Sequence, residues 1–192
     1  FFFSSRRRHT RFALVSWARD VYKRQALPDD EAKNKIIVLS KSASITAPAP
    51  GAAGDPRCNS DPAGTVKASL TIGSTSSGET HTTDLPCQNW VLLGSASSPK
   101  GYKYGDPELD DGTAKKVIWK NGSQLKATLF GRGPTTLDYD LQTGIVQSPV
   151  ALRFATQAGP ICLTCAGVAG KDGSDGKNFQ GKDCAAPAAC LP

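Results

Sequence analysis

The stretch KVIWKNGSQLKATLF, residues Lys116–Phe130, carries the clearest structural signal in the chain. Two apolar runs flank the dipeptide Asn121-Gly122. An Asn-Gly pair supplies the positive φ angles that a two-residue type I′ turn needs, so the stretch predicts a β-hairpin. The triplet Asn121-Gly122-Ser123 also matches the N-glycosylation sequon, but the chemistry of the turn explains these residues fully.

Short or alternating apolar runs continue on both sides of this hairpin. In Thr65–Ile72, apolar residues alternate with Thr, Lys and Ser, which places Val66, Ala68, Leu70 and Ile72 on one core-facing side. Turn residues interrupt the chain about every 8–12 residues, which is typical of sandwiches and barrels. Further strands are expected over Lys35–Ser42, Gly78–Cys87, Trp90–Gly94, Leu137–Leu141 and Val150–Thr156.

The expected fold class is all-β, an antiparallel β-sandwich or flattened barrel of roughly eight strands. Ala47–Pro56 is rich in Pro and Gly and is expected to be a loop, because Pro cannot donate to a sheet. Ala166–Pro192 is expected to be a loop-rich tail clipped by disulfides. Only Asp30–Lys35 has the pattern of a short helical turn, so helix content should be low.

Residues 1–25 differ in composition from the rest of the chain. They hold seven Lys and Arg residues and one Asp, and removing them from the chain's 23 basic and 17 acidic residues leaves sixteen of each in 26–192. The net charge of +6 therefore belongs to this leader. Its halves SSRRRHTR and VSWARDVYKRQ resemble the conceptual translation of sequencing-adapter DNA, so we expect 1–25 to be an artefact outside a single β-rich domain, 26–192.

Charge balance in 26–192 argues against a nucleic-acid-binding or membrane-surface protein, because a basic footprint should lie on the folded domain. No run approaches the roughly 18 apolar residues that a membrane span requires, so no membrane insertion is expected. The candidate partners that remain are neighbouring modules of a longer chain and a surface glycan. No cofactor is expected.

The domain contains an even number of cysteines, which indicates three disulfides in an oxidising compartment. Cys58 and Cys87 bracket the first predicted strand pair. For the four C-terminal cysteines we expect a nested pairing, Cys162 with Cys190 and Cys165 with Cys184, which folds the tail back as one flap. The competing interpretation is a zinc-ribbon-like site with four thiolate ligands, although its second pair departs from the usual C-x2-C spacing.

Three aromatic and two acidic side chains are candidates for binding or catalysis. Tyr102, Tyr104 and Trp119 would form a carbohydrate-binding platform if they were exposed in one plane, whereas strand alternation favours the core for them. The pair Asp138 and Asp140 would suit a glycoside hydrolase, but its apolar neighbours claim the core face.

The remaining polar candidates are expected to be structural. The acidic loops GDPELDDG and KDGSDGK fit ordinary turns better than calcium sites. His81, the single His of 26–192, has no serine or cysteine partner at a recognisable spacing. The sequence therefore predicts no catalytic residue and no metal ligand.

Four segments of the chain resemble segments of a known type of protein module. KGYKYGDPELDDG, KKVIWKNG, LDYDL and KDGSDGKNFQGKDCAAPAAC resemble an uncharacterised cysteine-containing β-rich module that recurs in secreted proteins of environmental bacteria. The resemblance covers nearly all of 26–192 and implies an extracellular domain, often one of several in a longer chain, with no catalytic residues to carry over. Similar modules have a further strand before the region matching DDEAKNKIIVLSK, which implies that one edge strand is missing here.

These observations lead to a functional expectation. The chain is expected to be a non-enzymatic module of the secreted or cell-surface space, with a structural or binding role. The alternatives are a carbohydrate-binding or adhesive module with exposed aromatics, and a zinc-ribbon-like module on the C-terminal cysteines. A hydrolase that uses Asp138 and Asp140 is a further rival; unchanged glycan hydrolysis after replacing both by Asn would exclude it.

Overall fold

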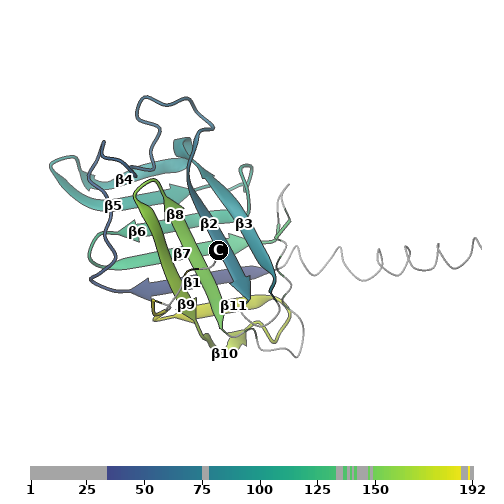
Figure 1. Ribbon diagram of the computed structural model, residues 1–192. Coiled ribbons are helices and arrows are strands. Elements are labelled where there is room, and N and C mark those ends of the chain that lie inside the picture. The colour runs from purple at the N-terminus through teal and green to yellow at the C-terminus, as the bar shows by residue number, and fades with distance from the viewer. Residues whose placement is uncertain are drawn as a thin grey trace, which may run out of the picture.

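The computed structural model describes residues 34–74, 78–132, 136–137, 139, 141, 147, 149–186 and 190. They form two β-sheets stacked as a sandwich (Figure 1). The strands of the front sheet cross those of the rear sheet steeply, as in orthogonally packed sheets. No α-helix occurs among these residues, and the all-β sandwich expected from the sequence is confirmed.

The rear layer is a seven-stranded sheet, which we call the large sheet. Its strands, in spatial order, are β10 (Gly167–Asp172), β11 (Asn178–Lys182), β1 (Lys35–Lys41), β7 (Gln124–Phe130), β6 (Ala114–Lys120), β5 (Ser98–Gly105) and β4 (Trp90–Ser95). All neighbours pair antiparallel except β1 and β11, which run parallel. Every second residue of β1 and β7 is buried, so one side of this sheet faces the core.

The front layer is a four-stranded antiparallel sheet, which we call the small sheet. Its order is β3 (Thr80–Pro86), β2 (Val66–Ser74), β8 (Val150–Thr156) and β9 (Gly159–Cys165). Ala68, Leu70 and Ile72 face the core as expected, but Val66 is 46% exposed. The β2–β3 register shifts between Val66 and Ala68, and this irregularity takes Val66 out of the core-facing row.

Aromatic side chains join the two sheets in the core. Phe154 of the small sheet packs edge-on against Trp119 of the large sheet, with ring centroids 5.0 Å apart, and lies 6.0 Å from Trp90. Trp90 in turn contacts Tyr104 at 5.4 Å, and Trp119 contacts Tyr102 at 5.9 Å. Aromatic pairs of this geometry add to the free energy gained from the area that they bury.

The central hairpin forms as predicted, but its turn differs. Lys120 pairs with Gln124, so the loop contains three residues and not two. Of these, only Gly122 has a positive φ, at 60°. The side-chain Oδ1 of Asn121 accepts a hydrogen bond from the backbone N–H of Ala47 at 3.1 Å. The type I′ turn was therefore a wrong prediction, and a three-residue loop with glycine in the left-handed region takes its place.

The C-terminal segment is more ordered than expected. Strands β10 and β11 lie within the predicted loop-rich tail, and β11 pairs with β1 from Lys35↔Asn178 to Leu39↔Lys182. The tail thus completes the large sheet, and the described residues form eleven strands where roughly eight were expected.

Two further predicted elements lie only partly within the described residues. Leu137, Tyr139 and Leu141 alternate toward the core and are buried, but these described positions do not form a strand. Of the expected helical turn Asp30–Lys35, only Asn34 and Lys35 lie within the described residues, and Lys35 begins β1. The Ala47–Pro56 loop is confirmed, since no helix or strand crosses it.

Candidate functional site

All six cysteines are paired. Cys58, in the long loop before β2, bonds to Cys87, which begins the short 3₁₀ helix Cys87–Asn89 directly after β3. The two Cα atoms are 4.6 Å apart, and Cys87 is buried. This bridge fixes the loop against the end of β3, as the spacing predicted.

The nested pairing of the four C-terminal cysteines is also confirmed. Cys165, at the end of β9, bonds to Cys184, and Cys162 bonds to Cys190. Cys184 follows β11, so its bridge to buried Cys165 connects the large sheet with the small sheet. The segment after β11 then crosses to the edge of β9, where Thr164 and Ala185 exchange backbone hydrogen bonds of 2.8 and 3.1 Å.

This pairing contradicts the zinc-ribbon-like interpretation. A structural zinc site needs deprotonated thiolates as ligands, and the four sulfur atoms in question are consumed in two disulfides. Within the described ranges, no other group of His, Cys, Asp and Glu side chains is arranged to hold a metal ion.

The aromatic platform is contradicted as well, because its members fill the core. Tyr102 and Tyr104 are 0% exposed, and Trp119 is 2% exposed. Tyr102 donates its hydroxyl to the Pro48 carbonyl at 3.0 Å, and Trp119 donates its indole N–H to the Thr46 carbonyl at 3.1 Å. Burial raises the pKa of Tyr104 to about 12, although a hydrogen bond from Asn89 opposes the shift. These rings stabilise the sandwich and offer no face to a sugar.

A buried carboxylate organises the loop above the Tyr102 ring. Asp55 is 2% exposed, accepts the backbone N–H of Gly51 at 2.7 Å, and forms two side-chain hydrogen bonds with Arg57. Burial opposes its ionisation, but hydrogen bonds from Arg57, Gly51 and Asn59 outweigh that cost and lower the Asp55 pKa to about 2. The Arg57 guanidinium lies 5.7 Å from the centre of the Tyr102 ring, so this cluster joins loop and core.

The acidic loops are turns, as expected. Asp106 accepts the backbone N–H groups of Asp110 and Asp111. In the second loop, Asp172 accepts both the N–H and the hydroxyl of Ser174, and Asp175 accepts three hydrogen bonds from Lys177 and Asn178. These carboxylates are engaged with their own loops. The pair Asp138 and Asp140 lies outside the described residues, so the hydrolase hypothesis stays untested.

His81 is a core histidine. It is 5% exposed on the inner side of β3, and its Nε2 lies 2.8 Å from the Thr113 hydroxyl. Ser69 and Asp84 lie on the opposite, outer side of the small sheet, so the sheet separates His81 from them. The arrangement brings together no triad of Ser, His and Asp from these residues.

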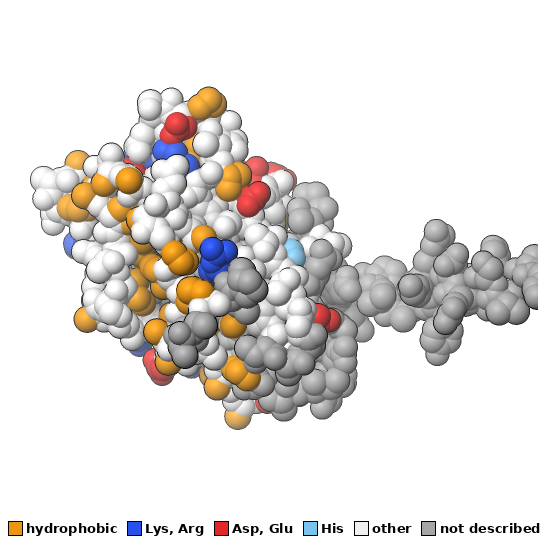
Figure 2. Space-filling model, viewed as in Figure 1, with side chains coloured by type: hydrophobic (Ala, Val, Ile, Leu, Met, Phe, Trp, Pro, Cys, Tyr) orange, Lys and Arg blue, Asp and Glu red, His pale blue; other side chains and the backbone are white. Residues whose placement is uncertain are grey.

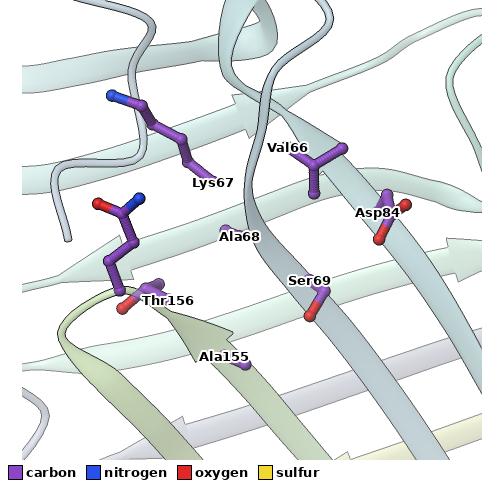
Figure 3. Close-up of a pocket in the computed structure, with 8 residues that line it drawn as sticks. Val66, Lys67, Ala68, Ser69, Asp84, Ala155 and Thr156 are labelled. Carbon is purple, nitrogen blue, oxygen red and sulfur yellow. The ribbon is translucent and has the colours of Figure 1, made fainter.

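A shallow hollow of about 300 Å³ lies on the outer side of the small sheet (Figure 3). Ser69 of β2 lies between its register partners Asp84 of β3 and Ala155 of β8. Lys67 stands at the rim and forms an ion pair with Asp61, while the Thr156 hydroxyl donates to the Gly159 carbonyl at 3.3 Å.

The hollow can bind a polar group, but its chemistry is limited. It offers the Asp84 carboxylate, the Ser69 hydroxyl and the Lys67 ammonium, which is paired with Asp61, on an open surface, and no histidine is among the described residues that line it. None of the residues around the hollow was predicted from the sequence to be a site residue. The available signal was the polar side of the Thr65–Ile72 alternation, which contains Lys67 and Ser69.

Among the described residues, no helix has the length and apolar character needed to cross a membrane. Comparison of the chain with protein-family models, with curated proteins and with solved structures finds no match in any of the three.

Proposed function

We propose that this chain is a non-catalytic module of the extracytoplasmic space with a structural or binding role. The observation that carries the proposal is the pairing of all six cysteines into three disulfides, which are stable in oxidising compartments and rare in the cytosol. Cys58–Cys87 holds the long loop before β2 against the end of β3, and Cys165–Cys184 joins the two sheets. Formation of these bridges requires an oxidising compartment.

The polar side chains support a non-catalytic role. Asp55, Asp106, Asp172 and Asp175 accept hydrogen bonds from their own loops, and His81 lies against Thr113 in the core. Groups held in this way stabilise the fold and are not poised for proton transfer to a substrate. The partners we propose are a neighbouring module of the same chain or a component of the cell surface.

The test is the mass of the intact protein, secreted from an expressing cell, before and after reduction. Three bridges predict that the unreduced protein is lighter by six hydrogens and does not react with a thiol reagent. Zinc is measured on the same sample. Free thiols in the secreted protein, or one bound zinc per chain, would refute the proposal and favour a reduced, metal-binding state.

A further inference from the structure

The outer side of the large sheet concentrates basic side chains. Strands β1, β4, β5, β6, β7 and β11 contain nine Lys residues and no Asp or Glu. Seven of the nine alternate with buried neighbours and therefore point outward from the sandwich. We call this set the lysine face: Lys35, Lys41, Lys103, Lys116, Lys120, Lys126 and Lys182.

The opposite side of the molecule has a different character. Figure 2 looks onto the small sheet, where most of the visible surface is uncharged and basic side chains are sparse. In the small sheet, Lys67 and Arg153 are the basic residues, and Asp84 is an acidic one. The acidic residues of the described chain lie mainly in loops. Although basic and acidic residues are equal in number in 26–192, the basic side chains are therefore concentrated on the outer side of the large sheet.

The strand register spreads the lysines over two dimensions. One row across the sheet reads Lys103, Ile118, Lys126, Leu39 and Lys182, so a lysine occurs on every second strand, roughly 10 Å from the next. Along β6, Lys116 and Lys120 lie two residues on either side of Ile118, about 7 Å away. The result is a grid of ammonium groups and not a single line.

The register also explains how the fold tolerates these charges. Every lysine of the lysine face has uncharged register partners; Lys41 pairs with Gln124 and Lys116 with Thr128, for example. No two of them are direct cross-strand neighbours, which is the arrangement that would cost most. The two ion pairs of the described residues involve Asp55 and Asp61, both outside the large sheet. The positive charge is thus spaced but not neutralised.

The composition of the face restricts what it can bind. Its lysines are separated by Ile37, Leu39 and Ile118, which are only partly buried. Phe130 is already surrounded by cations, with Lys35, Lys115 and Arg132 between 5.1 and 5.6 Å from its ring centre. The face thus provides no free ring on which bases or sugars could stack, and its strands contain no carboxylate to accept sugar hydroxyls.

The geometry points to a flat anionic lipid surface as the partner of the lysine face. A grid of point charges interleaved with aliphatic side chains matches a plane of anionic headgroups better than it matches one linear polymer, which would follow a single row. A net charge of zero over 26–192 does not exclude a membrane-surface role for one face on which the positive charges are concentrated. This inference deepens the proposed function by naming a partner, and it rests on that proposal only for the compartment.

The test is sedimentation of the full chain with vesicles of phosphatidylcholine alone or of phosphatidylcholine mixed with phosphatidylglycerol. The variant K103Q/K116Q/K182Q removes three exposed lysines from three strands of the lysine face. The matched control K67Q/R153Q/K177Q removes three cationic residues elsewhere. Both variants keep residues 1–33, so the charges of that segment are the same in every sample.

We expect binding to the anionic vesicles only, weakened more than about tenfold in the lysine-face variant and within about twofold in the control. Added salt should weaken it further. Equal losses in the two variants, or equal binding to both vesicle types, would overturn the inference. The inference would also be overturned if the parent protein bound no vesicles but bound duplex DNA or a sulfated polysaccharide, and the lysine-face variant lost that binding. The partner would then be a soluble polyanion. The mass measurement on the same sample tests the proposed function separately.

Discussion

Asp55 is a carboxylate that stays ionised although it is buried, because Arg57 and two backbone N–H groups solvate it. Its pKa in the folded protein is about 2, below the ordinary value of 3.8. A group whose pKa is lowered by folding stabilises the folded state above its ordinary pKa, and that contribution is lost as pH falls toward the folded pKa. The stabilisation by Asp55 is therefore present at neutral pH and declines between about pH 4 and pH 2.

Asp55→Asn should lower the free energy of unfolding by on the order of 2 kcal/mol at neutral pH, measured by urea denaturation. The difference from the parent protein should shrink as pH falls toward 2, where about half of the parent carboxyl groups are themselves protonated. The control is Asp61→Asn, since Asp61 pairs with Lys67 at a more exposed site and should contribute less than about 1 kcal/mol. A difference that stays constant down to pH 2 would contradict this account.

Gly101 is a glycine that the structure requires. Its φ is +120°, and a Cβ placed there would lie 2.0 Å from the Trp119 carbonyl oxygen of the neighbouring strand. Gly101→Ala should therefore destabilise the protein by about 3 kcal/mol or more, seen as a lower urea midpoint. Gly122→Ala is the matched control, because Gly122 also has a positive φ but faces open space, and it should cost about 1 kcal/mol. Equal effects would show that only the backbone angle matters at Gly101.

At the scale of residues, alternation predicted burial well but could not predict local irregularities. It placed Ala68, Leu70 and Ile72 in the core correctly, and it favoured the core for the aromatics. It failed for Val66 because a register shift between two strands leaves no mark in the sequence of one of them. It also could not show that the Asn121 side chain would bond to Ala47, 74 residues away.

Among the elements, the strands with strong apolar patterns were predictable, and the weak ones were not. The central hairpin and the strand pair of β2 and β3 follow from their alternation and turns. Strands β10 and β11 have the sequences GVAGKD and NFQGK, which are short and rich in glycine, so sequence propensity alone argues against them. These strands are stabilised by tertiary contacts: β11 pairs with β1, β10 pairs with β11, and the Cys165–Cys184 bridge holds the residues after β11 against β9.

The two nested bridges should differ in their contribution to stability. Cys165–Cys184 is buried and joins the two sheets, whereas Cys162–Cys190 attaches the terminal segment to the outer side of β9. Removing either bridge by paired Cys→Ala substitutions should cost about 2–5 kcal/mol, with the larger loss for C165A/C184A. Thermal unfolding of both variants measures this. Chain entropy alone favours the reverse order, because the separations are 19 and 28 residues, so a larger loss for C162A/C190A would contradict the structural argument.

At the scale of the molecule, the candidate surfaces depend on strand order, which the sequence did not reveal. Each lysine of the lysine face belongs to a strand that looks ordinary by itself, with polar residues on one side. Only the order β11, β1, β7, β6, β5 brings these polar sides together into one positive surface. The hollow around Ser69 likewise needs β3, β2 and β8 to be neighbours.

The segregated charge should make stability depend on salt. Repulsion among the lysines of the lysine face opposes folding, and dissolved ions screen it. Raising sodium chloride from low to physiological concentration should increase the free energy of unfolding by about 0.5 kcal/mol, and this increase should be smaller in K103Q/K116Q/K182Q than in K67Q/R153Q/K177Q. Urea denaturation at several salt concentrations measures it. An identical salt dependence in the two variants would contradict a repulsive lysine face.

The parallel pairing of β1 with β11 determines when the large sheet can be completed during synthesis of the chain. Strand β1 leaves the ribosome before the other strands described here, yet its partner β11 is the last of them to be made. The large sheet therefore cannot be completed until β11 has been synthesised, and contacts of such long sequence separation form slowly. Cys184 and Cys190 follow β11, so the two nested bridges close only at this same late stage. Closure of the sheet and oxidation of these cysteines are therefore coupled in time, because the sheet requires the chain to be made as far as Lys182 and the two bridges require it as far as Cys190.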